Sequence, residues 1–524
     1  MRKVLNWNGL TPPSVTCTGF NEWFRGGNID SLSLVFATGY LSNPASFYGH
    51  ILLKFNLAQV PSSSELLDES INFGASVPSN ENGVKYVFNG LFGGYDASFS
   101  NAQFYQQNHM YAENELRDMW EYELALSKNE VDQIVAHSWE LMRVKFVYYF
   151  LKKNCAYRMS NLLEMVIGQP LLPQALPWAI PVTVFNRLES LRRDGKPVVR
   201  KVRLIPSRLN SYHAKYTALS TTQKLLVKEI VDGALNFEQA VYLALPETEK
   251  ISIADTLLDY YEFRIVGDSK NIRFKKAKQV ALLERGKLAS QDSLAAEEWL
   301  GAKSVSPPHE GSKPSMIRLS LLNNNQLGNG IELRFRPTYF DFLELDAGRV
   351  ANSNLTMFDF RTIFANKRLG LKSLDLVNIE TLNLAQTPLA GDGGWAWKVK
   401  FGFDSQDLSC KNCMTFSAAG GLGKAVLITN NLTIYGMVDF FGQTPFLNSG
   451  TLGTVTRIGL IGSPTDGWKS SITLGEKSYI NGSQTSHRLV RWENRFGTQR
   501  DWDVRISYER NIARELKVGI SAYW

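Results

Sequence analysis

Alternation between apolar and polar side chains runs from residue 315 to residue 524 and restricts what this region can fold into. In the run from Trp395 to Phe403, WAWKVKFGF, aromatic residues or valine occupy every second position. Successive side chains of a β-strand point to opposite faces of its sheet, so this period of two predicts strands. With weaker runs included, we expect about twelve strands, each near the roughly 9 to 11 residues that cross a bilayer when tilted. The clearest further runs lie at 317–321, 331–335, 356–362, 432–440, 468–474, 502–508 and 516–524.

Such strands can face lipid or water, and aromatic residues at the strand ends favour lipid. Trp395, Trp468 and Tyr479 stand at ends of predicted strands, and the last strand finishes on Tyr523-Trp524. A final aromatic residue on a last alternating strand resembles the end of bacterial outer-membrane barrels, which carry aromatic girdles. A soluble β-sandwich or a closed barrel in water would show the same alternation and stays open. We expect an antiparallel transmembrane β-barrel over 314–524.

The rest of the chain is expected to form two further regions, because 524 residues exceed one ordinary core. Residues 1–205 mix short strand-like and helical runs, which indicates an α+β domain. Residues 206–313 are helical and polar, and the stretch from Ser304 to Pro314 is rich in Ser, Pro and Gly, as a linker would be. The predicted fold class is therefore α+β, with a helical middle region and a C-terminal barrel.

Charge is spread unevenly along the chain, whose net charge is +7. Between Arg187 and Lys228 there are eleven Lys or Arg residues against two Asp or Glu. Such a stretch suits an anionic membrane surface, or it is simply a solvated basic face. Aromatic residues do not alternate with these basic ones as they do in single-strand nucleic-acid binders, so no nucleic-acid partner is expected.

Four cysteines limit the metal and redox chemistry of the chain: Cys17, Cys155, Cys410 and Cys413. The last two have no second pair at metal-ligand spacing, so they indicate a local disulfide or two idle thiols and not a zinc site. We expect no metal and no cofactor. The basic start at Met1 lacks an apolar stretch of signal-peptide length, as expected of a mature or truncated form, or of a chain that stays inside the cell.

Cys155 and His50 are the residues on which catalysis is expected to depend. Cys155 opens a helix-like run, where the helix dipole stabilises a thiolate, and His50 lies in a strand-like run. A histidine beside such a thiol can act as its proton partner, although singly each residue is more often a packed core residue. The helix has an apolar stripe at Met159, Leu162, Leu163 and Val166, and a capping box at Ser127 and Glu130 opens a preceding helix expected to run towards Phe150.

A third polar residue orients the imidazole in papain-like sites, and Asn72 is the candidate here. It lies in the strand-like segment that follows the one with His50. Acyl transfer also needs fixed donors for an oxyanion, and we expect these from the backbone N–H of Cys155 and the side chain of Asn154. Weaker alternatives are Ser70 and Glu69 for the third residue and His109 for the base.

Five motifs follow one another in the N-terminal region. They are Ser46-x-x-Gly-His50, Asn72-Phe-Gly74, Asn89-Gly-Leu-Phe-Gly-Gly-Tyr95, Tyr111-x-x-x-Glu115-x-Arg117-Asp118-x-Trp120-Glu-Tyr122 and Asn154-Cys155-x-x-Arg158. Over roughly residues 20 to 170 this series resembles the Lnb N-terminal periplasmic domain. The resemblance implies a circularly permuted papain-like thiol fold, with His50 and Cys155 catalytic and Arg158 and Asn154 in support. It also implies N-acylation of bacterial lipoproteins, and the β region is similar to the barrel that accompanies this domain in some Gram-negative proteins.

These features together predict a cysteine acyltransferase anchored in the outer membrane that works through a thioester. Its thiol domain would lie in the periplasm, and its partners would be membrane lipid and a lipoprotein substrate. Two other classes stay open. One is a cysteine hydrolase of the cell envelope, a peptidase or amidase in which water takes the acyl group; the other is a non-enzymatic barrel protein with the thiol fold as a plug.

Overall fold

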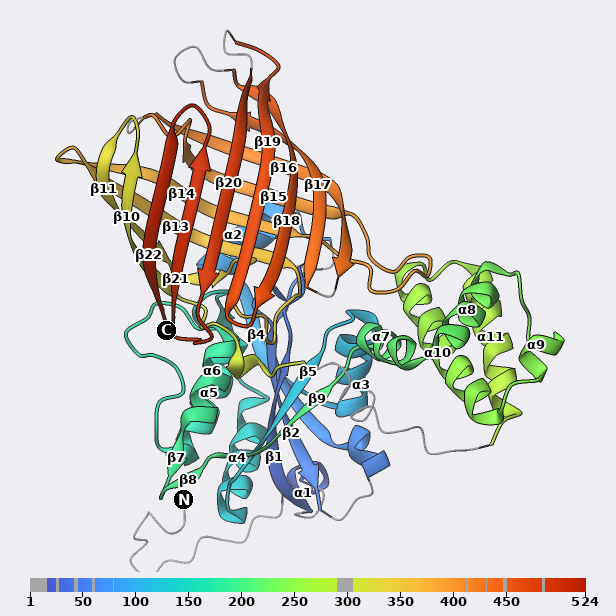
Figure 1. The fold of residues 1–524 in the computed structure, drawn as a ribbon. Coiled ribbons are helices and arrows are strands. Elements are labelled where there is room, and N and C mark those ends of the chain that lie inside the picture. Colours follow the sequence, from blue (N-terminus) through green and yellow to red (C-terminus); the bar gives the residue numbers. More distant parts are fainter. Residues whose placement is uncertain are drawn as a thin grey trace, which may run out of the picture.

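The computed structural model describes residues 17–24, 28–41, 46–58, 62–78, 80–289, 305–410, 413–429, 431–445, 450–482 and 486–524. The basic start at Met1 and the first residue of the expected linker, Ser304, lie outside these ranges. Within them the chain forms an N-terminal sheet domain, a helical region to one side of it, and a large β-barrel (Figure 1). Both smaller parts lie toward the same end of the barrel.

A seven-stranded antiparallel sheet is the scaffold of the N-terminal domain, with the strand order β6-β4-β3-β2-β1-β5-β9 among the described residues. Its strands are β1 (Ile29–Ala37), β2 (His50–Leu57), β3 (Glu69–Ala75), β4 (Tyr95–Gln103), β5 (Met119–Leu124), β6 (Phe146–Tyr148) and β9 (Val199–Ile205). β2 is central, and its alternation buries Ile51 and Leu53 on one face and Leu52 on the other. The strand that begins with His50 is therefore covered on both sides.

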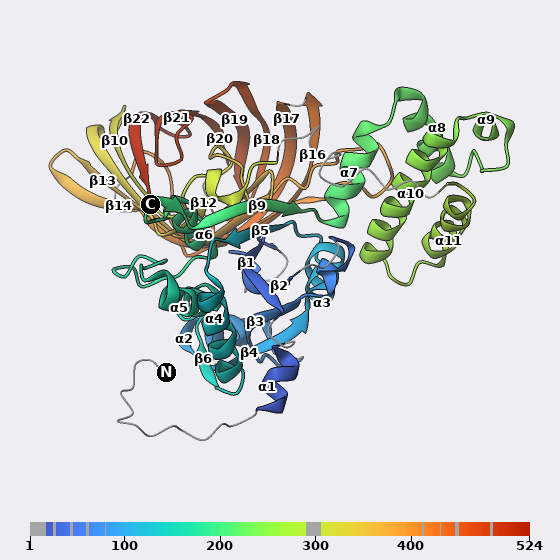
Figure 2. The ribbon, with the colours of Figure 1, turned by 90° about the horizontal axis from the view of Figure 1, so that it is seen from below.

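Helices and turns pack on both faces of this sheet (Figure 2). They are α1 (Thr18–Trp23), η3 (Ser62–Leu67), α2 (Gly83–Phe92), α3 (Phe104–Asn108), the π-helical turn η4 (His109–Asn114), α4 (Lys128–Leu141), α5 (Cys155–Ile167) and α6 (Pro181–Ser190), while β7 (Arg192–Arg193) and β8 (Lys196–Pro197) form a small hairpin. On one face Met159 and Leu163 of α5 pack with Ile51. On the other face Tyr111 of η4 packs with Leu52, so α5 and η4 enclose the start of β2.

The helix predicted from the capping box is confirmed at its start and wrong at its end. The carboxylate of Glu130 accepts the N–H of Ser127 at 2.7 Å and opens α4. The helix does not continue towards Phe150, because it ends at Leu141 and the chain then forms β6, which pairs with β4. The next helix, α5, begins at Cys155, as the sequence predicted.

The middle region is helical, as predicted. It consists of α7 (Arg208–Ala218), α8 (Thr221–Asp232), α9 (Ala240–Leu243), α10 (Glu247–Gly267) and α11 (Ile272–Gly286). In α7 the buried Tyr212 and Tyr216 join the small core of this region. Among the described residues, none of the helices combines the length and the apolar composition that crossing a membrane requires.

Twelve strands of the described C-terminal region close into one antiparallel barrel, as predicted. They are β10 (Met316–Asn324), β11 (Gly328–Arg336), β13 (Ser353–Ala365), β14 (Arg368–Thr381), β15 (Ala396–Ser405), β16 (Met414–Thr429), β17 (Leu432–Gln443), β18 (Leu452–Thr465), β19 (Trp468–Tyr479), β20 (Ser486–Phe496), β21 (Trp502–Arg510) and β22 (Arg514–Tyr523). β10 pairs with β22 and β11 pairs with β13, which closes the ring. The short β12 (Thr338–Phe340) adds to β13 beside this ring. The cysteines of the barrel, Cys410 and Cys413, form a disulfide.

The barrel is apolar outside and charged inside. Along β10, Ile317, Leu319 and Leu321 are exposed on the outer face, whereas Arg318 and Ser320 point inward and are buried. Leu321 keeps 70% of its surface exposed, while Arg318 keeps 6%. A barrel in water would bury the apolar face, so this arrangement excludes the soluble alternatives and shows that the outer face meets lipid.

The N-terminal domain packs against the outer wall of the barrel as well as its end. Asn354, Glu380 and Lys398 line the lumen, so their neighbours along the strands point outward. Five of these outward residues of β13, β14 and β15 pack with the core of the N-terminal domain: Leu355, Met357, Val377, Ile379 and Trp397. Further along the same strands, Phe360 and Phe401 are exposed to lipid. The domain therefore shields the lipid-facing wall near one end of these strands.

Candidate active site

Cys155 occupies the first turn of α5 and is buried, with 3% of its surface exposed. Asn154 caps the helix, since its side-chain oxygen accepts the N–H of Tyr157 at 3.2 Å. Its amide nitrogen donates to the carbonyl oxygens of Phe150 at 2.9 Å and Ala179 at 2.8 Å. Both amide hydrogens are thus engaged, so Asn154 supports the helix start in this conformation and does not offer the free oxyanion donor that we expected from its side chain.

His50 and Asn72 meet across two neighbouring strands. Leu52 pairs with Asn72 in the sheet, which places Asn72 diagonally opposite His50 on the same face. The Nε2–H of His50 donates to Oδ1 of Asn72 at 2.5 Å. The structure therefore brings together the pair that the sequence proposed, and this bond leaves Nδ1 of His50 as the nitrogen with a free lone pair.

The weaker candidates for the third residue and the base make contacts with other residues than His50 and Cys155. The hydroxyl of Ser70 donates to the carbonyl of Ala102 at 2.7 Å, and Glu69 pairs with Phe55 across the sheet. The Nδ1 of His109 is bonded to the carboxylate of Glu113 at 3.0 Å in an exposed position. Within the described residues, no group of three or more His, Cys, Asp or Glu side chains is placed to hold a metal ion.

A backbone hydrogen bond joins the histidine strand to the cysteine. The N–H of Ile51, the residue after His50, donates to the sulfur of Cys155. On the other side of the imidazole, the ring of Tyr111 stacks on His50 with 5.7 Å between ring centroids. The thiol and the imidazole thus lie together between α5, the start of β2 and η4.

Arg117 contacts the ring of Tyr111 and anchors it to the neighbouring backbone. Its guanidinium lies 4.8 Å from the centroid of the Tyr111 ring and is buried. It donates to the carbonyls of Thr38 at 2.6 Å and Ala37 at 3.0 Å, and to the carboxylate of Glu115 at 2.7 Å. Tyr111 of the fourth sequence motif therefore packs against the imidazole, and Arg117 of the same motif holds Tyr111. Residues Tyr111 and Arg117 belong to the site, although no local pattern assigned them a role.

Tyr148 lies next to the backbone of the cysteine. Its hydroxyl oxygen accepts the N–H of Cys155, and its side chain is 7% exposed. This N–H is the donor that we expected for an oxyanion. A phenol at the same point can donate its own O–H once a substrate oxygen arrives, and sequence inspection missed it because β6 is only three residues long.

Glycines of the third motif allow the segment before Cys155 to pack closely. A Cβ at Gly90 would lie 2.2 Å from the ring of Phe150, and Gly93, with φ +85°, would meet the ring of Tyr149 at 2.5 Å. The N–H of Phe150 donates to the carbonyl of Gly90 at 2.7 Å. Since Phe150 also accepts from Asn154, α2 supports the start of the cysteine helix.

Arg158, the last residue of the fifth motif, lies among aromatic rings one turn into α5. Its guanidinium is 4.1 Å from the ring centroid of Phe146 and 5.8 Å from that of Phe73. Burial lowers the pKa of Arg158. These contacts join α5 to β6 and β3, so Arg158 supports the helix without touching the thiol.

The enclosed site favours neutral side chains at rest. Burial raises the pKa of the Cys155 thiol to about 11, although the N–H groups of Ile51 and Ala156 and the charge of Arg117 favour the thiolate. Part of His50 is accessible, yet desolvation of its ring lowers its pKa to about 4, opposed by the bond to Asn72 and reinforced by Arg117. Burial therefore outweighs the helix start that led us to expect a thiolate, and it favours a neutral thiol beside an unprotonated imidazole.

Alkylation of Cys155 should reveal this neutral pair. In a Cys17→Ala variant, where Cys155 is the remaining free thiol, the iodoacetamide rate should rise about tenfold per pH unit from about pH 7 to pH 10, because the thiolate fraction grows until pH exceeds the pKa. Protonation of His50 should matter only below about pH 4. Mass spectrometry of the labelled peptide measures the rate, and a constant rate from pH 5 to pH 9 would instead show a preformed thiolate–imidazolium pair.

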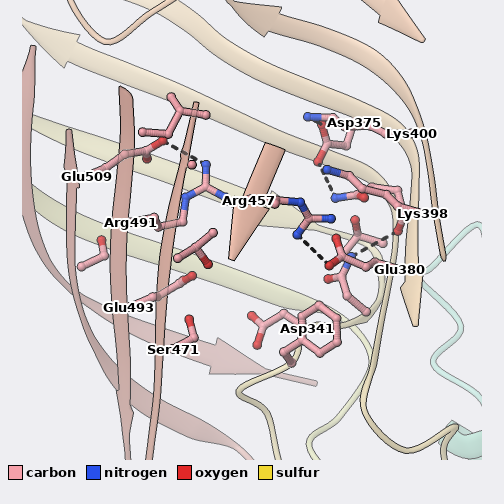
Figure 3. A pocket seen from close by; sticks show the side chains of 18 of the residues that line it. Asp341, Asp375, Glu380, Lys398, Lys400, Arg457, Ser471, Arg491, Glu493 and Glu509 are labelled. Atoms are coloured by element: carbon pink, nitrogen blue, oxygen red, sulfur yellow. Dashed lines mark hydrogen bonds and ion pairs between the residues drawn. The ribbon is translucent and has the colours of Figure 1, made fainter. Parts of the chain in front are cut away.

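The barrel lumen contains a cavity of about 380 Å³ whose lining is strongly charged. Figure 3 shows its acidic and basic side chains facing one another in pairs. The pairs are Lys398–Asp439 at 3.0 Å, Lys400–Asp375 at 3.0 Å, Arg457–Glu380 at 2.9 Å and Arg491–Glu509 at 2.9 Å. Acyl chains would have to displace water from these charges, so the lumen is unsuited to a lipid.

The segment that follows β12 lies at the end of this lumen toward the N-terminal domain. Phe342 and Leu343 line the cavity there. Asp341 is paired with Arg505 of β21 at 3.2 Å, and Asp346 with Lys469 of β19 at 2.6 Å. The segment is thus tied to strands several positions around the ring from β13.

Comparison with protein families decides the nature of the N-terminal part, since residues 19–189 match the model of the Lnb N-terminal periplasmic domain. Residues 19–189 are an Lnb domain. The match includes all five motifs and extends beyond residue 170, where the resemblance in the sequence had ended, into α6 as far as Glu189. Residues 305–524 match a domain of unknown function (DUF7840), which coincides with the barrel and the segment leading into it. No curated protein matches the chain.

Solved structures with some similarity to the barrel are outer-membrane channels. The KdgM porin is 9% identical, with a TM-score of 0.27, and the match covers 40% of this chain and 99% of the porin. The NanC porin is 8% identical, with a TM-score of 0.26, covering 40% and 100% of the two chains. The COG4313 outer membrane channel from Pseudomonas putida F1 is 10% identical, with a TM-score of 0.27, covering 40% and 95%. Similarity this low carries no argument about what the barrel does.

The location of the protein follows from its own two parts. The barrel has a lipid-facing outer wall, and the Lnb domain is a periplasmic domain. The protein is therefore an outer-membrane protein whose Lnb domain lies on the periplasmic side. The ends of β13 and β15 that carry Leu355 and Trp397 pack with the Lnb domain and are therefore the periplasmic ends of these strands.

Proposed function

We propose that this protein is a cysteine acyltransferase that moves an acyl chain from a membrane lipid to the amino group of a lipoprotein. The observation that carries the proposal is the juxtaposition of Cys155 and His50, joined through the N–H of Ile51, in a domain packed against a lipid-facing wall. A thiol at a helix start beside a neutral imidazole suits nucleophilic catalysis. The adjacent leaflet would supply an acyl donor that water does not dissolve.

In the first step, Nδ1 of His50 takes the proton of the Cys155 thiol as the sulfur attacks the carbonyl carbon of a lipid ester. A C–S bond forms and the ester C–O bond breaks. The leaving alkoxide takes the proton from His50, which leaves an acyl thioester on Cys155 and a free lipid hydroxyl. Asn72 holds the ring in the required tautomer through its bond to Nε2.

In this proposal two hydrogen-bond donors stabilise the negative charge that develops on the carbonyl oxygen. One is the backbone N–H of Cys155, and the other is the hydroxyl of Tyr148, which accepts that N–H in the resting protein. Burial raises the pKa of Tyr148 well above its ordinary value, so its proton stays in place and can be donated.

In the second step, the free α-amino group of a lipoprotein attacks the thioester carbonyl. A C–N bond forms, the C–S bond breaks, and the proton lost by the amine returns to the sulfur through His50. The products are an amide and the free thiol of Cys155. If water attacked in place of the amine, the products would be a fatty acid and the same thiol, which is the hydrolase alternative.

Mass spectrometry of an acceptor peptide tests the proposal. Purified protein in detergent is incubated with phospholipid and a diacylated lipoprotein peptide, in parallel with Cys155→Ala and His50→Ala. We expect the peptide to gain the mass of one acyl chain only with the wild type. Release of fatty acid without peptide acylation would replace the transferase with a hydrolase, and inactivity towards both would leave the Lnb domain as a non-enzymatic part.

Substitution of Tyr148 by phenylalanine should slow acyl transfer by about 100-fold in kcat with little change in KM, because an oxyanion donor acts in the transition state. Tyr149→Phe is the matched control, since this neighbouring phenol packs on Gly93 and away from the Cys155 N–H. Steady-state kinetics with a water-soluble ester donor measures both constants. Equal effects of the two substitutions would remove Tyr148 from the oxyanion site.

A further inference from the structure

Helix α2 carries an exposed aromatic pair that the chemistry above does not use. Phe88 and Phe92 are 61% and 67% exposed, and their ring centroids lie 4.7 Å apart. They are one helical turn apart and therefore share one face of α2. Large aromatic side chains grouped in this way on a surface mark a site of interaction.

The two views of the fold place this helix beside the barrel wall. In Figure 1, α2 lies at the height of the lower strand ends, behind the barrel, while α3 and α4 lie further down. In Figure 2, which looks from below, α2 lies outside the ring of barrel strands. The helix is therefore outside the lumen and at the level of the periplasmic strand ends, where lipid headgroups surround the barrel.

The lipid-facing wall next to the Lnb domain is already occupied by protein. Leu355, Ile379 and Trp397 point outward from β13, β14 and β15, yet they pack with the core of the Lnb domain. Because outward residues of the barrel meet lipid, a domain that covers them stands in the space of the periplasmic leaflet. The exposed face of Phe88 and Phe92 on the same domain adds to the apolar surface that the barrel wall presents to lipid.

Basic side chains lie near the C-terminal end of α2. Phe150 packs on Gly90 of α2, and the exposed Lys152 and Lys153 follow it in the chain. The Lys153 ammonium is 6.0 Å from the ring of Tyr149, which packs on Gly93 at the end of α2. Aromatic residues with nearby lysines are the combination that settles at a membrane interface, where the rings reach the acyl boundary and the ammonium groups meet anionic headgroups.

We propose that α2 inserts Phe88 and Phe92 into the periplasmic leaflet beside β13–β15, and that acyl chains reach Cys155 laterally along this helix. The lateral route to Cys155 rests on the proposed function, whereas the insertion of α2 does not. α2 contacts the start of the cysteine helix through Gly90, Phe150 and Asn154. Gly90 is on the side of α2 opposite Phe88 and Phe92, so a lipid held on the aromatic face lies about one helix diameter from the segment that begins the active site. The charged lumen offers no comparable route.

Photocrosslinking tests the membrane contact without any need for activity. p-Benzoylphenylalanine replaces Phe88 or Phe92 in the full-length protein, which is reconstituted into vesicles of phosphatidylethanolamine and phosphatidylglycerol. The control position is Tyr105 of α3, an aromatic residue 43% exposed on a helix further from the barrel. After irradiation, mass spectrometry should find phospholipid adducts at positions 88 and 92 at about tenfold the yield at position 105.

Lipid yields at positions 88 and 92 no higher than at position 105, or crosslinks only within the protein, would overturn the membrane contact. A second measurement addresses the lateral route. In a Phe88→Ser, Phe92→Ser variant, the ratio of the rate with vesicle phospholipid to the rate with a water-soluble ester should fall about tenfold.

An unchanged ratio would overturn the lateral route while leaving acyl transfer intact. If the wild type failed with every donor, the proposed function would fail, and the crosslinking result would still decide whether α2 meets lipid.

Discussion

Replacement of Cys155 by alanine should abolish acyl transfer, with a rate reduced by at least about 10⁴-fold, because the thioester cannot form without the sulfur. Wild-type protein incubated with phospholipid alone should gain the mass of one acyl chain on the peptide that contains Cys155. Hydroxylamine should remove this mass, since it cleaves thioesters. The variant should show neither the adduct nor the product, while its fold persists because a buried thiol is replaced by a slightly smaller side chain.

Cys17→Ala is the matched control, because Cys17 is also a free cysteine but is exposed. It should retain both the acyl adduct and the activity. Intact-protein mass spectrometry measures the adduct, and circular dichroism melting confirms the fold of each variant. Full activity in Cys155→Ala, or loss of the acyl adduct in Cys17→Ala, would show that Cys155 is not the nucleophile.

Substitution of Gly49 by alanine should damage both stability and activity. Gly49 has φ +88°, and a Cβ there would lie 2.4 Å from the ring of Phe36 and 2.7 Å from the carbonyl oxygen of Ala37. The left-handed backbone costs about 1 to 2 kcal/mol for a residue with a Cβ, and relief of the overlap costs about 1 to 3 kcal/mol more. Since His50 follows directly, the imidazole should shift, and activity should fall by about 100-fold or more.

Gly74→Ala serves as the control for this effect. Gly74 lies two residues beyond Asn72 on β3, and a Cβ there meets nothing within 4 Å. We expect its free energy of unfolding to change by no more than about 0.5 kcal/mol. Urea denaturation of the detergent-solubilised protein compares the two variants. If Gly49→Ala unfolded at the wild-type midpoint with wild-type activity, the close contact with β1 would not position the histidine.

The barrel could be predicted from sequence because every second residue obeys one rule over a long stretch. Ile317 and Arg318 point to opposite faces for the same reason that any strand alternates, so neither depends on distant parts of the chain. The sequence favoured lipid through its strand-end aromatic residues but could not exclude a soluble sandwich or barrel. That required the closed ring, in which Arg318 is enclosed and Leu321 is exposed.

The site was predictable where a residue's role follows from its local element. Cys155 at a helix start and His50 on a strand are local features, and Asn72 followed from the expected pairing of neighbouring strands. Tyr111 and Tyr148 reach the site through tertiary packing, from a π-helical turn and from a three-residue strand. The neutral state of the thiol is likewise a product of burial, which outweighs the helix start and cannot be read from neighbours in sequence.

One hydrophobic core joins the Lnb domain to the barrel, and it couples the folding of the two parts. Tyr48, two residues before His50, donates or accepts a hydrogen bond with Thr338 at 3.1 Å, and its ring packs on that of Tyr339. The turn that presents His50 therefore completes its packing on barrel residues, and folding of the two parts is thermodynamically coupled. A chain still in transit, with its barrel strands unpaired, lacks the barrel residues on which this turn packs, so assembly in the membrane and completion of the site coincide.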